Sequence, residues 1–183
     1  MYIENRITRF LDDLLKASEN RISDHCVWAP IIMMPGFGVT SSIEGWLEHN
    51  NLKNFYITAT LRNVAKFKVE CFPPLSGNDI RIVGAQELER LFTPVEKEVN
   101  VIFTTDEIDS IDENTIIVID DYARACDETR KELFDLIAYE KVIDIRYNES
   151  DCKRKVKPKL IVVVIDELQI DYLNEKEKRL FGI

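Results

Sequence analysis

Apolar and polar positions along this chain follow two different periods, and these periods predict its helices and strands. Residues 2–18 carry apolar side chains at helical spacing on one face, which predicts an amphipathic helix followed by a polar turn that ends near residue 24. By the same criterion, further helices are expected over residues 40–50, 84–92, 127–139 and 173–181. Continuous or weakly alternating apolar runs predict strands over residues 26–34, 53–59, 99–104, 115–121 and 160–165.

The remaining segments carry turn and connector signals. Residues 72–78 are rich in Pro, Gly, Ser and Asn and are expected to form a loop. An acidic connector is expected over residues 106–114, and residues 142–159 are expected to contain a hairpin with arms over 142–147 and 156–159. Pro30 has no N–H to donate, so the paired part of the first strand is expected to begin at or after it.

Strands that alternate with helices predict an α/β fold with a doubly wound, mainly parallel sheet flanked by helices. The length of 183 residues fits a single domain over residues 1–183. Ligands of such sheets bind beyond the carboxyl ends of the strands. Three expected strand ends carry candidate chemistry: a glycine-containing loop, the pair Asp120–Asp121, and Asp166.

The loop after the first strand resembles a phosphate-binding loop. Glycines let successive backbone N–H groups curl around phosphate, and a helix N-terminus adds the positive end of its dipole. Met33 stands where the first glycine of such a loop belongs, and Val39 stands where its lysine belongs. An ordinary strand–helix connection is the alternative interpretation. The candidate phosphate-binding residues are Pro35, Gly36, Phe37, Gly38, Val39, Thr40 and Ser41.

The acidic pair Asp120–Asp121, at the end of the strand expected over residues 115–121, is the second candidate feature. An aspartate at such a strand end can hold Mg²⁺ through water, and Thr40 would be its partner in the loop. The adjacent Asp121 can polarise an attacking water, which makes it a candidate catalytic residue. The alternative is that Asp121 starts the turn and caps the next helix. We favour the functional interpretation for the pair.

From Cys26 to its end, the chain resembles AAA+ ATPases, especially the MoxR-like branch with its versions in phage genomes. The phosphate loop of that family is matched at Pro35, Gly36, Gly38 and Thr40. In the family, the acidic pair is followed by Asn-Arg-Ala. Here the arginine and alanine are matched by Arg124 and Ala125. The asparagine is not matched, because Tyr122 and Ala123 stand between the acidic pair and Arg124. The resemblance implies that ATP or ADP and Mg²⁺ bind here.

The same resemblance places Asp166 where the family has an asparagine that senses the γ-phosphate, which makes Asp166 a second candidate catalytic residue. An arginine that reaches a neighbouring subunit would be Arg179 or Arg124, although a solvated helix charge is the favoured interpretation of Arg179. The helical lid of the family is not found before residue 183. The implied partners are AAA+ subunits in a homo- or hetero-oligomer and a protein client.

A basic cluster lies in the hairpin region that, in the wider group, projects into the pore of a ring. Its members are Lys153, Arg154, Lys155, Lys157 and Lys159. They could touch nucleic acid, but a solvated loop that balances an acidic protein is the favoured interpretation. A formal net charge of −9 argues against broad attraction to nucleic acid or to anionic membranes.

Four cysteines are scattered without paired spacing, and with two histidines in the chain they do not predict a zinc site. A reducing cytosol is therefore expected, and the resemblance to the MoxR-like branch implies a bacterial or phage-infected cell. Neither a signal peptide nor a membrane span is expected. Two functions remain open: an AAA+-type ATPase with weak or lost hydrolysis, and a non-catalytic scaffold subunit that acts through protein contacts.

Overall fold

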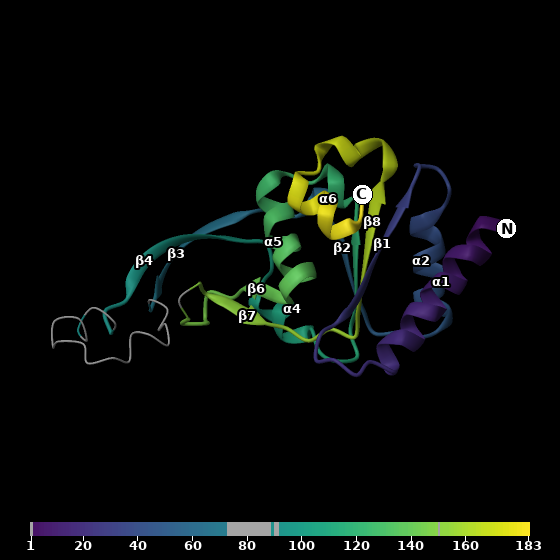
Figure 1. Ribbon diagram of the computed structural model, residues 1–183. Helices are drawn as coiled ribbons and strands as arrows, with labels where there is room; N and C mark the ends of the chain where they lie inside the picture. Colours follow the sequence, from purple (N-terminus) through teal and green to yellow (C-terminus); the bar gives the residue numbers. More distant parts are fainter. Residues whose placement is uncertain (1, 73–88, 90–91, 150) are drawn as a thin grey trace.

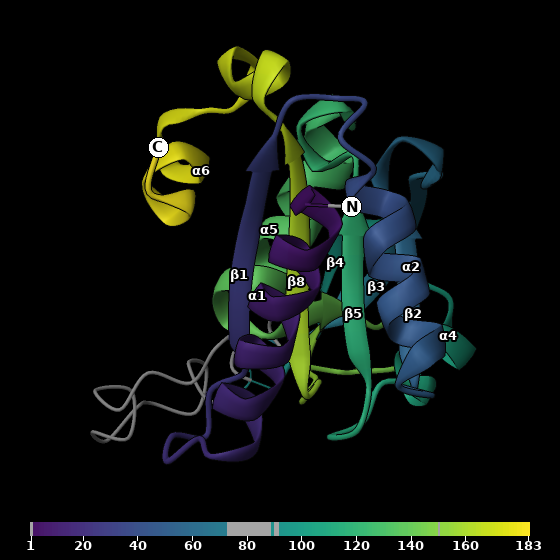
Figure 2. The same ribbon diagram turned by 90° about the vertical axis from the view of Figure 1, so that its right-hand side faces the viewer.

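The computed structural model describes residues 2–72, 89, 92–149 and 151–183, and at its centre is a four-stranded parallel sheet. Its strands lie in the order β1-β8-β5-β2 (Figures 1 and 2). Their bounds are Val27–Met33 for β1, Leu160–Asp166 for β8, Ile116–Asp120 for β5 and Asn54–Thr58 for β2. Helices flank the sheet, which confirms the expected α/β fold.

Helices cover both faces of the sheet because neighbouring residues of a strand point to opposite sides. Ile116 and Val118 of β5 belong to the apolar cluster under helices α1 (Tyr2–Glu19) and α2 (Val39–His49). Ile117 and Ile119 belong to the cluster under α5 (Asp127–Tyr139) and α6 (Glu175–Phe181). Figure 2 shows α1 and α2 in front of the sheet and α5 behind it. The central strands are therefore buried on both sides, as their continuous apolar runs predict.

A two-stranded antiparallel ribbon extends away from this body (Figure 1). It consists of β3 (Ala65–Cys71) and β4 (Val95–Val101). The prediction of a strand over residues 99–104 is wrong in its bounds, because β4 covers residues 95–101. β4 pairs with β3 outside the central sheet. Three consecutive charged residues, Glu96, Lys97 and Glu98, explain the miss, because they remove the apolar signal from the first half of β4. The helix expected over residues 84–92 and the loop expected over residues 72–78 lie almost entirely outside the described residues.

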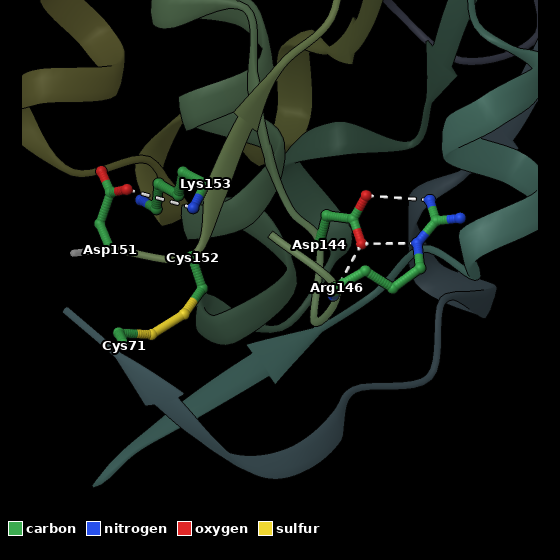
Figure 3. The surroundings of a disulfide bond; sticks show 6 residues. All are labelled: Cys71, Asp144, Arg146, Asp151, Cys152 and Lys153. Atoms are coloured by element: carbon green, nitrogen blue, oxygen red, sulfur yellow. Dashed lines mark hydrogen bonds and ion pairs between the residues drawn. A yellow bond between two sulfur atoms is a disulfide. The ribbon is translucent and has the colours of Figure 1, made fainter. Parts of the chain in front are cut away.

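A hairpin of β6 (Lys141–Ile143) and β7 (Lys153–Lys155) lies beside the ribbon, which confirms that this region forms a hairpin. The second arm expected over residues 156–159 is wrong in its bounds, because β7 lies in the stretch expected to connect the arms. A disulfide between Cys71 at the end of β3 and Cys152 just before β7 joins the two (Figure 3). Their Cα atoms are 6.4 Å apart, although 81 residues separate them along the chain. The cysteine spacing gave no sign of this pair, because a disulfide depends on proximity in space.

The acidic stretch expected to be a connector contains helix α4 (Thr105–Ser110), so this prediction is wrong. Thr104 caps the helix: its side chain accepts from the Glu107 backbone N–H, while the Glu107 carboxylate accepts from the Thr104 backbone N–H. This reciprocal capping box stabilises a six-residue helix that has little apolar periodicity of its own.

The prediction that β1 pairs only from Pro30 onward is also wrong, because β1 begins at Val27 and Pro30 lies in register with Val163 of β8. β1 is an edge strand, so a residue without an N–H is tolerated where it faces the open side. Three short 3₁₀ segments follow strands β2, β5 and β8 in the described part of the chain: η1 (Ala59–Leu61), η2 (Tyr122–Arg124) and η3 (Glu167–Tyr172). None of the described helices has the length and apolar content that crossing a bilayer requires.

Candidate functional site

The three expected strand ends meet around one hollow of about 310 Å³. It lies at the carboxyl ends of β1, β5 and β8, which are neighbours in the sheet. The sheet order explains the convergence, because β8 lies between the strand that precedes the glycine loop and the strand that ends in the acidic pair. The residues that line the hollow are Met33, Met34, Pro35, Gly36, Phe37, Gly38, Val39, Thr40, Asp120, Asp121, Arg124, Val164, Ile165 and Asp166.

The glycine loop needs its glycines for backbone conformation. Gly36 and Gly38 have φ angles of +89° and +70°, in the left-handed region that side chains disfavour. A Cβ added at either position would meet no atom within 4 Å, so packing does not require glycine there. Gly38 is also the N-cap of α2, and no described side chain caps that helix end. The first N–H groups of α2 are therefore open to an anion.

The loop is open rather than plugged. Val39 is only 8% exposed and packs in the apolar cluster with Ile31 and Ile43. Phe37 lines the hollow and remains 44% exposed. Ser41, predicted as a phosphate ligand, lies instead beside a second hollow between α1 and α2. The site therefore brings together six of the seven loop residues.

Asp120 is held by three protein donors. The Thr40 hydroxyl donates to its Oδ2 at 2.9 Å, and the Tyr56 hydroxyl donates to the same oxygen at 2.7 Å. The backbone N–H of Asp121 donates to its Oδ1 at 2.9 Å. The sequence analysis did not predict Tyr56 as a site residue. The alternation of side chains along the strand could have shown only that Tyr56 and Ile57 lie on opposite faces of the sheet, with Tyr56 on the side of α2. Its closeness to Asp120 also required knowing that β2 pairs with β5.

Asp121 adopts a left-handed backbone with φ +56°, where a branched or bulky residue would be strained. Partial burial raises the pKa of its carboxyl, and the negative charges of Asp120 and Asp166 act in the same direction. The Arg124 guanidinium, which also lines the hollow, opposes the rise in this pKa. The alternative interpretation of Asp121 is confirmed in part. Asp121 starts the turn as the N-cap residue of η2, and its carbonyl accepts from the Arg124 N–H at 3.1 Å. Its side chain makes no capping hydrogen bond, and the N-cap of α5 is Cys126.

Asp166 and Arg179 differ in their relation to the hollow. The Asp166 carboxylate lines it and also caps η3, where its Oδ1 accepts from the Leu168 N–H at 2.9 Å. This capping is a sufficient structural reason for an acid at the strand end. Arg179 is exposed on α6 and does not line the hollow.

The backbone of the glycine loop suits a phosphate, whereas three of the side chains that line the hollow are carboxylates. The open N–H groups of α2 and the left-handed glycines form a concave backbone surface of the kind that binds anions. Among the described residues, no group of three or more His, Cys, Asp or Glu side chains could hold a metal ion. In the described lining, Arg124 is the one cation facing Asp120, Asp121 and Asp166.

No family model and no curated protein matches this chain. The resemblance to AAA+ ATPases therefore rests on the residues of the chain itself, and it enters below as part of a proposal.

The basic hairpin residues are mostly engaged within the chain. Lys153 forms an ion pair with Asp135, and Arg154 forms ion pairs with Asp109 and Asp144. The remaining ion pairs join Lys155 to Glu140 and Lys159 to Glu19, whereas Lys157 is exposed. This pairing favours the interpretation of the cluster as charge balance for an acidic protein.

We expect Asp121→Asn to raise the thermal stability of the protein at pH 7. A carboxyl whose pKa is raised by folding contributes stability that is present below its unfolded pKa, about 3.9, and is lost as pH rises through the raised folded pKa. At pH 7 the ionised Asp121 therefore destabilises the fold, and asparagine, which also tolerates the left-handed backbone, removes that cost.

Melting temperatures of the wild type and Asp121→Asn, measured from pH 7 down to pH 3, check this expectation. The advantage of the variant should shrink as pH falls and vanish below the unfolded pKa. Asp13→Asn, an exposed carboxyl on α1, serves as control. A variant that melts below the wild type at pH 7 would contradict the expectation.

Proposed function

We propose that this chain binds the phosphates of a nucleotide at the glycine loop and hydrolyses ATP very slowly or not at all. The observation that carries the proposal is the hydrogen bond from Thr40, at the second residue of α2, to Asp120 at the end of β5, 80 residues away. It unites the two halves of the predicted site, the glycine loop and the acidic strand end, around one hollow.

The resemblance to the MoxR-like branch of AAA+ ATPases supports the same proposal. On that basis Gly36, Gly38 and the N-terminus of α2 would bind phosphate, and Asp121 would lie where water is oriented. The nucleotide would be ATP or ADP. The chain would work in an oligomer with related subunits, in a cytoplasmic setting, and would act on a protein client.

Slow hydrolysis follows from the charges around the loop. With valine at position 39, no lysine of the loop meets the transferring phosphoryl group. Removing one such stabilising contact commonly lowers the rate on the order of 10²–10³-fold. The carboxylates of Asp120, Asp121 and Asp166 also repel the negative charge that develops in the transition state, which raises its energy.

A second candidate is a scaffold that does not bind nucleotide. The observation that favours it is the acidic lining, because three carboxylates and one guanidinium repel a free triphosphate. In that case the glycine loop would be a structural connection, and the function would lie in contacts with other chains.

Isothermal titration calorimetry with ATP and ADP separates the two candidates. We expect micromolar to sub-millimolar binding that is lost in Gly38→Glu, because a side chain there strains the left-handed backbone and places a carboxylate beside the phosphates. Gly45→Ala, in the middle of α2 with no left-handed requirement, is the matched control and should bind normally.

No heat at millimolar nucleotide in any variant would support the scaffold. Phosphate release by the same samples tests hydrolysis. Robust Mg²⁺-dependent turnover by the wild type, abolished in Asp121→Asn, would overturn the expectation of slow hydrolysis.

A further inference from the structure

Tyr56 in β2 forms a hydrogen bond to Asp120 in the neighbouring strand β5. Asp120 is the acid that would otherwise be the metal ligand of the site. Tyr56 lies opposite Val118 of β5, so its side chain is on the same face as that of Asp120 two residues further along. Its hydroxyl donates to Asp120 Oδ2 at 2.7 Å, beside the Thr40 hydroxyl at 2.9 Å. Two O–H groups from different elements therefore converge on one carboxylate oxygen.

These donors use most of the acceptor capacity of Asp120. A carboxylate offers about four lone-pair sites, and Tyr56, Thr40 and the Asp121 N–H take three of them. Asp120 is only 8% exposed, so water has little room to supply a replacement. Burial, followed by the hydrogen bond to Asp120, raises the pKa of Tyr56, so the hydroxyl keeps its proton at neutral pH.

Mg²⁺ requires a different arrangement. It demands near-octahedral coordination by oxygen and retains several of its waters, which themselves need acceptors such as a free carboxylate oxygen. Hydroxyl hydrogens that point at Asp120 Oδ2 present positive charge where the cation or its bound water would approach. A cation can use this oxygen only after a donor has turned away.

We propose that Tyr56 is a specificity-determining residue that keeps divalent cations off Asp120 and thereby uncouples phosphate binding at the glycine loop from Mg²⁺. The part that concerns phosphate rests on the proposed function, whereas the exclusion of the cation from Asp120 does not. Tyr56 acts through Asp120 and has no role in a chemical step.

The first test measures Mn²⁺ binding to the nucleotide-free protein by electron paramagnetic resonance. Tyr56→Phe keeps the ring and removes only the hydroxyl, and we expect it to bind Mn²⁺ about ten-fold more tightly than the wild type, since a hydrogen bond to a charged acceptor is lost from the metal-free state. Adding Asp120→Asn to Tyr56→Phe should remove the gain. Tyr147→Phe, which removes a tyrosine–carboxylate hydrogen bond to Glu149 outside the hollow, should leave binding unchanged.

The Mg²⁺ dependence of the melting temperature provides a second readout, and a purely structural role of Tyr56 would not change it. In chelator, Tyr56→Phe should melt below the wild type. Added Mg²⁺ should recover part of this loss in the variant and should not stabilise the wild type. Wild-type protein that binds Mn²⁺ as tightly as Tyr56→Phe, or a variant that gains neither affinity nor Mg²⁺-dependent stability, would overturn the proposal.

The nucleotide arm compares ATP affinity with and without Mg²⁺ in both proteins. The gain in affinity from Mg²⁺ should be about ten-fold larger in Tyr56→Phe. An equal gain in the two proteins would refute the uncoupling. If neither protein binds nucleotide while Tyr56→Phe still gains Mn²⁺ affinity, the proposed nucleotide function fails and the exclusion of cations by Tyr56 stands.

Discussion

Removing the Cys71–Cys152 disulfide is expected to lower the free energy of unfolding by about 2–4 kcal/mol. The bond closes a long loop, with 81 residues of sequence separation, and therefore restricts the unfolded chain strongly. In the folded state it fastens the β3–β4 ribbon to the β6–β7 hairpin, and each half-cystine is only 1% exposed. Backbone hydrogen bonds of Cys152 to Asp144 and Glu149 hold the hairpin end of this link in place.

Urea denaturation of the oxidised protein and of the double variant Cys71→Ala/Cys152→Ala measures the difference. Cys126→Ser, which removes an exposed free thiol and keeps a hydroxyl beside Thr129, is the control and should unfold like the wild type. In denaturant without reductant, only Cys26 and Cys126 should react with a thiol reagent. Reaction of all four cysteines, or equal stability of the double variant, would contradict the prediction.

The disulfide also bears on the compartment in which the protein works. In a reducing cytosol the pair would exist as thiols, whereas an oxidising compartment would keep it closed. The double variant therefore reports the stability that the chain would have in the cytoplasmic setting of the proposal.

Glu177→Leu is expected to cost about 3 kcal/mol or more in the free energy of unfolding. Glu177 is 2% exposed, and its Oε1 accepts from the Tyr122 hydroxyl at 2.9 Å. The same oxygen lies 3.2 Å from Arg130 Nε, in an ion pair that lacks hydrogen-bond alignment. Leucine would leave the guanidinium of Arg130, itself 9% exposed, without this counter-charge. It would also break the capping box with Asn174 at the start of α6.

Urea denaturation of Glu177→Leu against Glu175→Gln, an exposed carboxylate of the same helix, checks this prediction. Adding Arg130→Met to Glu177→Leu should recover part of the loss, because it removes a buried guanidinium that would keep only the exposed Asp127 carboxylate as its counter-charge. Loss of less than about 0.5 kcal/mol in Glu177→Leu would show that this ion pair contributes little.

The elements that the sequence predicts well are those whose burial is uniform along their length. All five residues of β5 are buried, and α5 has one buried apolar face with an acidic first turn. Such patterns depend only on which faces meet the core, so β5, β8 and α5 could be found without knowing the topology. The convergence of the strand ends on one hollow followed from the parallel sheet for the same reason.

The misses are features whose cause lies elsewhere in space. The β3–β4 ribbon pairs outside the sheet, and Cys71 meets a partner far along the chain. Tyr56 acquires its role only because β2 lies next to β5. Helix α4 is the exception, because Thr104 and Glu107 carry a local capping-box signature that could have been recognised.

Val39 bears on how this chain could evolve. Lysine at this position would complete the phosphate-loop pattern, but the valine side chain is part of the core beside Ile31 and Ile43. A lysine there must either desolvate its ammonium group or leave a gap in the apolar cluster as it turns toward the hollow. The first step from this sequence toward an efficient hydrolase would therefore lower stability before it raised activity. Repacking around Ile31 and Ile43 would have to come before the lysine.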